Sequence, residues 1–197
     1  MRHLALALAL ALVAASVAAA QDKVFRAGAF AQDVTPTKFP ISVNGNMNDV
    51  QATKVHDRLH ARCLVLDDGR TKLAIVIVDS CMIPRAIFDT AKRLAHEATG
   101  IPPERVLMAA THAHSCPTVG GVFQSEPDAD YVKLLPTLIA KGVKRAHDQR
   151  VPAKIGWAVE REPTQVFNRR WKRTKELIPP DQFGGTRDLV QMNPGYR

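Results

Sequence analysis

The sequence predicts an α/β fold, in which a mixed sheet with a βαβ unit is flanked by helices and forms an incomplete part of a larger layered α/β domain. Residues 106–110 (VLMAA) form a short continuous apolar run, typical of a strand buried on both faces of a parallel sheet. Residues 73–79 (LAIVIVD) form the clearest buried strand. Between them, residues 85–98 repeat apolar side chains at helical spacing. Strand, helix and strand with short connections make a βαβ unit, so the two strands should be parallel.

The segments before this unit predict further strands and turns. Residues 24–28 predict an edge strand. Residues 33–36 (DVTP) predict a turn, and residues 43–46 (VNGN) predict either a turn or a loop that approaches a site. Residues 55–66 (VHDRLHARCLVL) alternate between two faces and predict a long strand, which residues 67–70 (DDGR) turn into the next one.

Two helices are predicted. The first should begin near Pro84, which suits a first helical turn, and should stop at Gly100. The second should cover residues 128–148, where Pro136 is expected to kink or split it.

The end of the chain is less regular. Residues 153–160 resemble another strand, but after Pro163 no helix or strand pattern is evident. An irregular stretch of this length is uncommon in a compact domain unless it is functional or disordered. We therefore expect the region 21–197 to be incomplete at its C-terminus.

The first 20 residues have the pattern of a signal peptide. Arg2 begins a short basic region, an apolar stretch of Leu and Ala follows, and Ala18–Ala20 offer small residues for cleavage before Gln21. A membrane anchor is the competing interpretation, but the apolar stretch is short for a membrane span. We expect the protein to be exported, either to a periplasm or to the exterior.

The chain is basic. Its 197 residues carry a formal net charge of +8, which falls to +7 when Arg2 leaves with the signal peptide. Many of these charges lie in the last third, so a partner with negative charge is expected, such as an anionic membrane surface. Nucleic acid is not expected, because the export signal directs the protein away from it and few aromatic residues accompany the charges.

Three cysteines, Cys63, Cys81 and Cys116, are an odd number for an exported protein. At least one must be free, paired between chains or paired with a segment outside this sequence. Neither a disulfide framework nor a CxxC zinc spacing is present. Cys116 lies two residues after His114, which raises the hypothesis of a thiol nucleophile, although a structural cysteine is the favoured interpretation.

The strongest candidate site follows the apolar run at residues 106–110. His112 and His114 come directly after it, at the carboxyl end of a predicted strand, where open α/β sheets bind ligands. If both remained extended, their side chains would point to the same face and could reach one metal ion or one substrate group. The alternative is a pair of loop histidines hydrogen-bonded to the backbone.

Asp79 ends the other strand of the βαβ unit and should therefore open on the same edge as His112. A carboxylate there could ligate the metal itself or fix the tautomer of the histidine ring. The other interpretation is that Asp79 caps the following helix.

Several motifs, taken in order, resemble the N-terminal catalytic domain of neutral/alkaline non-lysosomal ceramidases. AATHAHSCP at 109–117 resembles the family's A-A-T-H-T-H-S-G-P, and FNRR at 167–170 resembles its later N-R segment. Weaker likenesses are AQDVTP at 31–36, VHDRLHARCLVL at 55–66 and IVDSCMI at 77–83. The resemblance extends over about the whole mature chain. Cys116 departs from it, because it replaces the motif's glycine.

The resemblance implies a zinc-dependent hydrolase that cleaves the amide of ceramide into sphingosine and a fatty acid. It implies that His112 is a zinc ligand, that His114 is a catalytic residue in the substrate pocket and that Arg169 contacts the substrate. The family's further ligands, a second His, a Glu and a Tyr, and its motif serine have no counterpart before Arg197. The chain would thus carry only the N-terminal part of the site, with weak metal binding and no activity by itself.

A second hypothesis comes from a different functional class. The chain could be an exported, non-catalytic module that binds a lipid headgroup or a glycan through its basic C-terminal region and the crevice near His112. This hypothesis predicts a stable monomeric fold without metal. Metal-dependent barrel hydrolases also use H-x-H, but they have repeated β/α units that this sequence lacks.

Overall fold

The computed structural model describes residues 24–164, 170–172 and 190–192. The predicted signal peptide at 1–20 lies outside these residues. The chain divides into two compact units, Met1–Lys154 and Ile155–Arg197. Within the described residues of the first unit, the fold is mixed α/β, as the sequence predicts.

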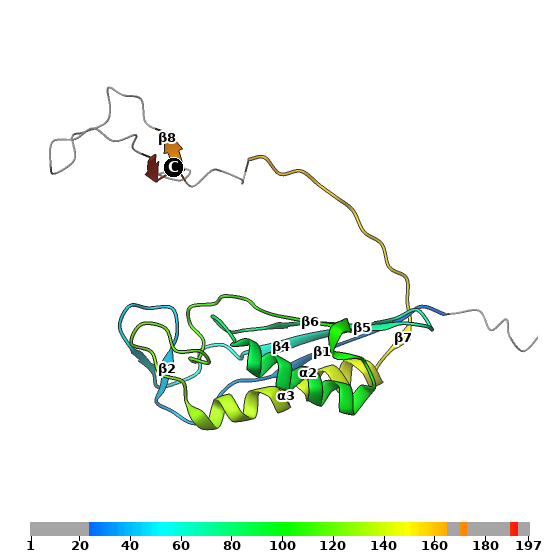
Figure 1. Cartoon of the computed structure of the whole chain (residues 1–197), viewed down its shortest axis with the longest axis horizontal. Coiled ribbons are helices and arrows are strands. Elements are labelled where there is room, and N and C mark those ends of the chain that lie inside the picture. The colour runs from blue at the N-terminus through cyan, green and yellow to red at the C-terminus, as the bar shows by residue number, and fades with distance from the viewer. Residues whose placement is uncertain (1–23, 165–169, 173–189, 193–197) are drawn as a thin grey trace, which may run out of the picture. The chain divides into compact units, whose positions relative to one another are not determined.

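A five-stranded mixed sheet forms the centre of the first unit (Figure 1). Its strand order is β6-β5-β4-β1-β7. The β5 and β6 strands are parallel, whereas all other neighbours are antiparallel. The bounds of the strands are β1 (Arg26–Asp33), β4 (His60–Asp67), β5 (Lys72–Val78), β6 (Val106–Ala110) and β7 (Val151–Pro152).

Both described α-helices lie on the same face of this sheet (Figure 1). They are α2 (Arg85–Thr99) and α3 (Ala129–Asp148), and the short 3-10 helix η1 (Pro103–Arg105) precedes β6. A separate antiparallel pair is formed by β2 (Ile41–Val43) and β3 (Val50–Ala52). In the second unit, β8 (Arg170–Lys172) pairs with β9 (Val190–Met192). This short ladder was not expected from the irregular sequence after Pro163.

The helix ends follow local sequence signals. Pro84 precedes α2, and Gly100 closes it in the left-handed conformation, with φ of 71°. The side chain of Asp128 caps α3 by accepting a hydrogen bond of 2.8 Å from the backbone N–H of Tyr131. Pro136 lies inside α3 without splitting it, and the helix is continuous over its 20 residues.

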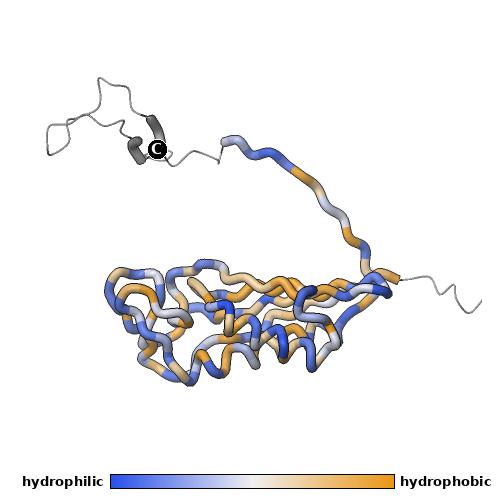
Figure 2. The backbone as a smooth tube through the Cα atoms, viewed as in Figure 1, coloured by the Kyte–Doolittle hydropathy of each residue, from blue (hydrophilic) through white to orange (hydrophobic). Residues whose placement is uncertain are grey.

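The core lies between the sheet and the two helices. Alternate residues of β4 are buried, which confirms the alternation predicted there. In β5, predicted as a buried strand, it is also alternate residues that are buried, and both sets pack against apolar residues of α3. Figure 2 shows the hydrophobic residues along these strands and their mixing with hydrophilic residues along the helices. At one end of this core, the hydroxyl of Tyr131 donates a hydrogen bond of 2.9 Å to the carbonyl of Val34. Burial raises the pKa of Tyr131 well above its usual value.

The prediction that β6 is buried on both faces is wrong. In the described part of the chain β6 is an edge strand, and the side chain of Leu107 is 60% exposed. The reason is that α2 and α3 cover only one face of the sheet. Strand β1, predicted as an edge strand, instead pairs with β4 along its whole length and with β7 on its other side.

Two predicted strands have different bounds in the structure. Strand β4 begins at His60 rather than Val55, because its partner β1 ends at Asp33 and the N–H of Leu59 donates to the Thr35 hydroxyl instead. Residues 153–160 form no strand. The N–H of Ala153 still donates to the Phe25 carbonyl, but β1 begins at Arg26, so its ladder reaches no further along this segment.

None of the helices in the described residues combines the length and the apolar character that a membrane crossing requires.

At Gly28 in β1, the C-terminal end of α3 approaches the sheet closely. A Cβ atom at this position would lie 2.1 Å from the backbone carbonyl oxygen of Ala146. We predict that Gly28→Ala lowers the free energy of unfolding by about 3 kcal/mol or more, because the clash is with backbone and cannot relax by a rotamer change. Urea denaturation would measure the loss. The control is Gly156→Ala, where a Cβ meets nothing within 4 Å, and equal stability of the two variants would contradict this packing.

Candidate metal centre

The parallel pairing of β5 and β6 continues past the ends of both strands. The N–H of Thr111 donates to the carbonyl of Val78 at 3.0 Å, and the N–H of His112 donates to that of Ser80 at 2.9 Å. His112 then adopts a left-handed conformation, with φ of 64°, which few residues other than glycine adopt. This turn ends the extended chain and brings the His112 ring against Cys81.

The backbone of Cys81 fixes the tautomer of His112. Nδ1 of the ring lies 2.8 Å from the Cys81 carbonyl oxygen, which can only accept a hydrogen bond. Nδ1 therefore carries the proton, and Nε2 keeps a free lone pair. The Sγ atom of Cys81 lies 3.7 Å from the same Nδ1, so the carbonyl and the thiol of Cys81 both contact this nitrogen.

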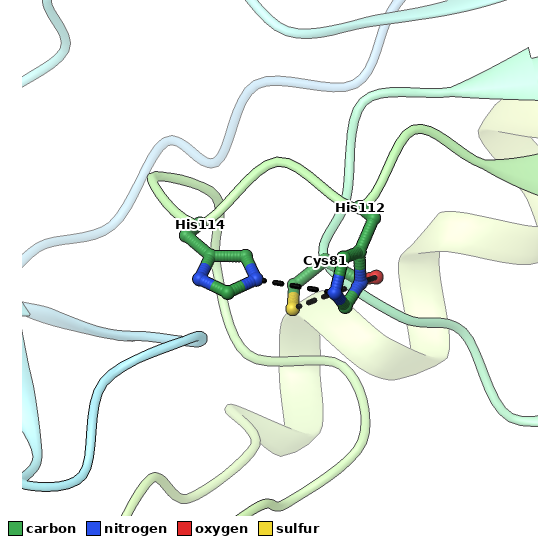
Figure 3. A group of neighbouring side chains, drawn as sticks. All are labelled: Cys81, His112 and His114. Atoms are coloured by element: carbon green, nitrogen blue, oxygen red, sulfur yellow. Dashed lines mark hydrogen bonds between the residues drawn. The ribbon is translucent and has the colours of Figure 1, made fainter. Parts of the chain in front are cut away.

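His114 reaches the free lone pair of His112. The two Nε2 atoms are 3.2 Å apart, and the rings meet edge to face with centroids 4.7 Å apart. Because Nε2 of His112 accepts, Nε2 of His114 must donate. The sequence analysis expected the two side chains to converge because both stay extended; they do converge, but through the left-handed turn at His112. Figure 3 shows the rings and the Cys81 thiol turned toward one another.

Cys81, His112 and His114 form a cluster that could hold a metal ion, called here the CHH cluster. One ligand atom from each residue lies within 4.8 Å of those of the other two. Imidazole nitrogen and thiolate sulfur suit zinc or a related transition metal better than magnesium or calcium, which prefer oxygen ligands. Cys81 is 6% exposed and His114 is exposed, so the cluster lies at the surface with its sulfur on the inner side.

Cys81 was not placed in the site by the sequence analysis. It lies in the connection between β5 and α2, two residues after Asp79. Since Asp79 was expected at this edge of the sheet, Cys81 could have been expected there too. A cysteine in an apolar context is usually a core residue, and its Ser-Cys-Met setting gave no other signal.

Asp79 lies at the predicted edge but makes different contacts. Its carboxylate accepts hydrogen bonds from the backbone N–H of His60 at 2.9 Å and from the Arg62 guanidinium at 2.7 Å. Asp79 thus ties the end of β5 to the start of β4. It does not cap α2, whose N-cap is Pro84, and the Cys81 carbonyl holds the ring nitrogen in the way expected of Asp79. Arg169, the predicted substrate contact, lies outside the described residues.

The predicted VNGN loop does approach the site. Gly45 has φ of 105°, and a Cβ atom there would lie 2.4 Å from Cγ of His114, so only glycine leaves room for the ring. Asn44, which is buried, fastens the loop: its backbone N–H donates to the Cys116 carbonyl and its side-chain amide donates to Gly120.

The hypothesis of a nucleophilic Cys116 is not supported. Cys116 is 1% exposed, and burial, with the charges of Asp79 and Cys81 adding to it, raises its thiol pKa to about 11. The thiol therefore stays protonated near neutral pH, whereas a nucleophile needs a lowered pKa. All three cysteines are free and buried, so Cys116 is a structural residue, as favoured from the sequence.

A cavity of about 210 Å³ lies beside the histidine loop. Ser115, which directly follows His114, and Pro117 form part of its wall. The rest of the wall is mainly apolar and comes from the segments around β2 and β3, namely Phe39, Ile41, Val43, Ala52, Val55 and Leu59, with a few polar residues.

We predict that Gly45→Ala displaces the His114 ring and weakens zinc binding by about tenfold or more, an effect typical of residues that orient metal ligands. Gly100→Ala is the control, because Gly100 also has positive φ but a Cβ there meets nothing within 4 Å. Both variants should lose about 1–2 kcal/mol of stability from the backbone conformation. Calorimetric zinc titration separates them, and equal affinities would refute the role of Gly45.

The comparisons with known proteins agree with this architecture. No protein-family model and no curated protein matches the chain. Among solved structures, the neutral ceramidase from Pseudomonas aeruginosa matches with a TM-score of 0.58 and 24% identity, over 67% of this chain and 23% of that one. A structure described as ceramidase complexed with C2 matches with a TM-score of 0.56 and 24% identity, over 66% of this chain and 22% of that one. The chain therefore matches less than a quarter of each ceramidase, and over that part it shares the ceramidase fold.

Proposed function

We propose that this chain is the N-terminal part of a ceramidase-like, zinc-dependent hydrolase that cleaves a lipid amide such as ceramide into sphingosine and a fatty acid. The observation that carries the proposal is the convergence of the His112 and His114 Nε2 atoms, 3.2 Å apart, at the edge of a sheet with the ceramidase fold. Neither the fold nor the histidine pair alone would support this function, since each also occurs in proteins that carry out other reactions.

His112 is the proposed zinc ligand. The Cys81 carbonyl holds its Nδ1 proton and so keeps the Nε2 lone pair directed at the site, as metal-bound histidines require. When bound, zinc polarises the amide carbonyl and lowers the pKa of the attacking water. His114 is the proposed catalytic residue, since its Nε2 lies beside the Nε2 atom of His112 that would bind the zinc. Arg169 is proposed to contact the substrate, as the motif resemblance implies.

The apolar cavity supports a lipid substrate. A lipid amide has a hydrocarbon chain that needs an apolar surface, and the apolar residues of the cavity wall offer one, although Lys54, His56 and Asp57 also line it. The basic character of the chain, with a formal net charge of +8, supports approach to an anionic membrane surface. The signal-peptide pattern at residues 1–20 supports export to a periplasm or the exterior.

The main test is hydrolysis of a short-chain ceramide by the natural product of the gene that encodes this chain. We predict that the reaction needs zinc, stops with a chelator and resumes when zinc is restored. His112→Ala should lower kcat/KM by about 100-fold or more, because the ion loses a ligand. His96→Gln, on the exposed surface of α2, is the matched control and should leave kcat/KM unchanged. Release of sphingosine is the measurement.

Two outcomes would reject the proposal. One is ceramide hydrolysis that does not depend on zinc or on His112. The other is binding of ceramide without any cleavage, which would favour the exported lipid-binding module instead.

A second prediction concerns the cavity. Ala52→Phe fills space in its wall and should raise KM for a short-chain ceramide several-fold while leaving kcat and zinc affinity nearly unchanged. Ala98→Phe, an exposed substitution on α2, is the control. Steady-state kinetics over a range of acyl lengths would show the effect, and an unchanged KM at every length would place the hydrocarbon chain elsewhere.

A further inference from the structure

We infer that the Cys81 thiolate is a metal ligand, so that Cys81, His112 and His114 together hold one zinc ion. This inference deepens the proposed function and rests on it for the choice of zinc, and it makes His114 a zinc ligand in place of the catalytic residue named there. It assigns to the chain a sulfur ligand that neither the motif resemblance nor the sequence patterns indicated.

The positions of the two histidines fit a tetrahedral ion. With Zn–N distances of about 2.0–2.1 Å, tetrahedral angles place two ligand nitrogens about 3.3–3.4 Å apart. The two Nε2 atoms are 3.2 Å apart before any adjustment. The proton now shared between them occupies the place that an ion would take, so binding would release this proton and the proton of the Cys81 thiol.

The position of Cys81 fits the same ion. Its sulfur is 3.7 Å from Nδ1 of the His112 ring, whose Nε2 would bind the ion, and the three ligand atoms of the CHH cluster lie within 4.8 Å of one another. A Zn–S bond of about 2.3 Å would put the sulfur about 3.5–3.6 Å from each of the two ligating Nε2 atoms. Cys81 has one side-chain torsion between its backbone and the sulfur, so the sulfur would approach the two Nε2 atoms by a rotation about it.

The backbone around Cys81 is held in place. The carbonyl of Ser80, its neighbour, accepts the N–H of His112, and the hydroxyl of Ser80 donates to the carbonyl of Met82 at 3.2 Å. Ser80 is itself buried. Cys81 thus acts twice on one ion, since its carbonyl orients the His112 ring while its sulfur binds the metal, and both come from a segment fixed before the ion arrives.

Three protein ligands leave one position of a tetrahedral ion open, the arrangement of catalytic rather than structural zinc. His112 and His114 are both exposed, so the CHH cluster is accessible from the surface at which a substrate would arrive. The CHH cluster therefore lets this chain bind zinc with its own residues. This departs from the single ligand that the motif resemblance gives to the region before Arg197.

X-ray absorption at the zinc edge tests the assignment on the full chain loaded with one equivalent of zinc. We expect one sulfur neighbour at about 2.3 Å and nitrogen or oxygen neighbours at about 2.0–2.2 Å. Cys81→Ser should remove the sulfur neighbour and weaken zinc binding by about tenfold or more, because a hydroxyl is a poorer zinc ligand than a thiolate. Cys63→Ser, which removes a buried thiol inside the core, is the matched control and should keep both properties.

Circular dichroism of each variant separates loss of a ligand from loss of the fold. Absence of zinc binding in the folded wild-type chain would overturn the inference, as would a spectrum with only nitrogen and oxygen neighbours. A sulfur neighbour that persists in Cys81→Ser would also overturn it. A sulfur neighbour without ceramide cleavage would reject the proposed function alone, whereas zinc-dependent cleavage without a sulfur neighbour would reject this inference alone.

Discussion

The site depends on the parallel pairing of β5 and β6. Their register sets Val78 opposite Ala110, and two further backbone hydrogen bonds carry the pairing to Ser80 and His112. Because parallel strands end at the same edge, Cys81 and His112, which are 31 positions apart along the chain, become neighbours there. A shift of one residue in this register would turn the side chains to opposite faces and separate Cys81 from His112.

The rest of the first unit supports this edge. The core under β4 and β5 holds the strands against α2 and α3, and Asp79 links the end of β5 to β4 through His60 and Arg62. From the other side, the loop that contains Asn44 and Gly45 is tied to the histidine loop by backbone and side-chain hydrogen bonds. The rings and their loop are therefore held by hydrogen bonds on both sides, from the segment of Cys81 and from the loop of Asn44, which suits a site that needs a fixed geometry.

Much of the fold follows from local sequence patterns. The hydrophobic periods gave β5, β6, α2 and α3 nearly to the residue, and the βαβ rule correctly put Asp79 and His112 at one edge. The predictions were wrong where contacts with distant segments determine the structure. Residues 55–59 have the sequence pattern of a strand, but no strand lies opposite them. Leu107 belongs to an apolar run typical of a buried strand, but it lies on an edge strand and is exposed. The role of Cys81 depends on a carbonyl-to-imidazole hydrogen bond and on a left-handed turn at His112, and periodicity encodes neither.

The left-handed turn at His112 also lowers the stability of the folded protein. A residue with a Cβ atom loses about 1–2 kcal/mol in the left-handed region, a penalty that glycine avoids. At this position a histidine is therefore a worse choice for folding than glycine or asparagine would be. The proposed role of the ring as a metal ligand would account for a residue that costs stability at this position.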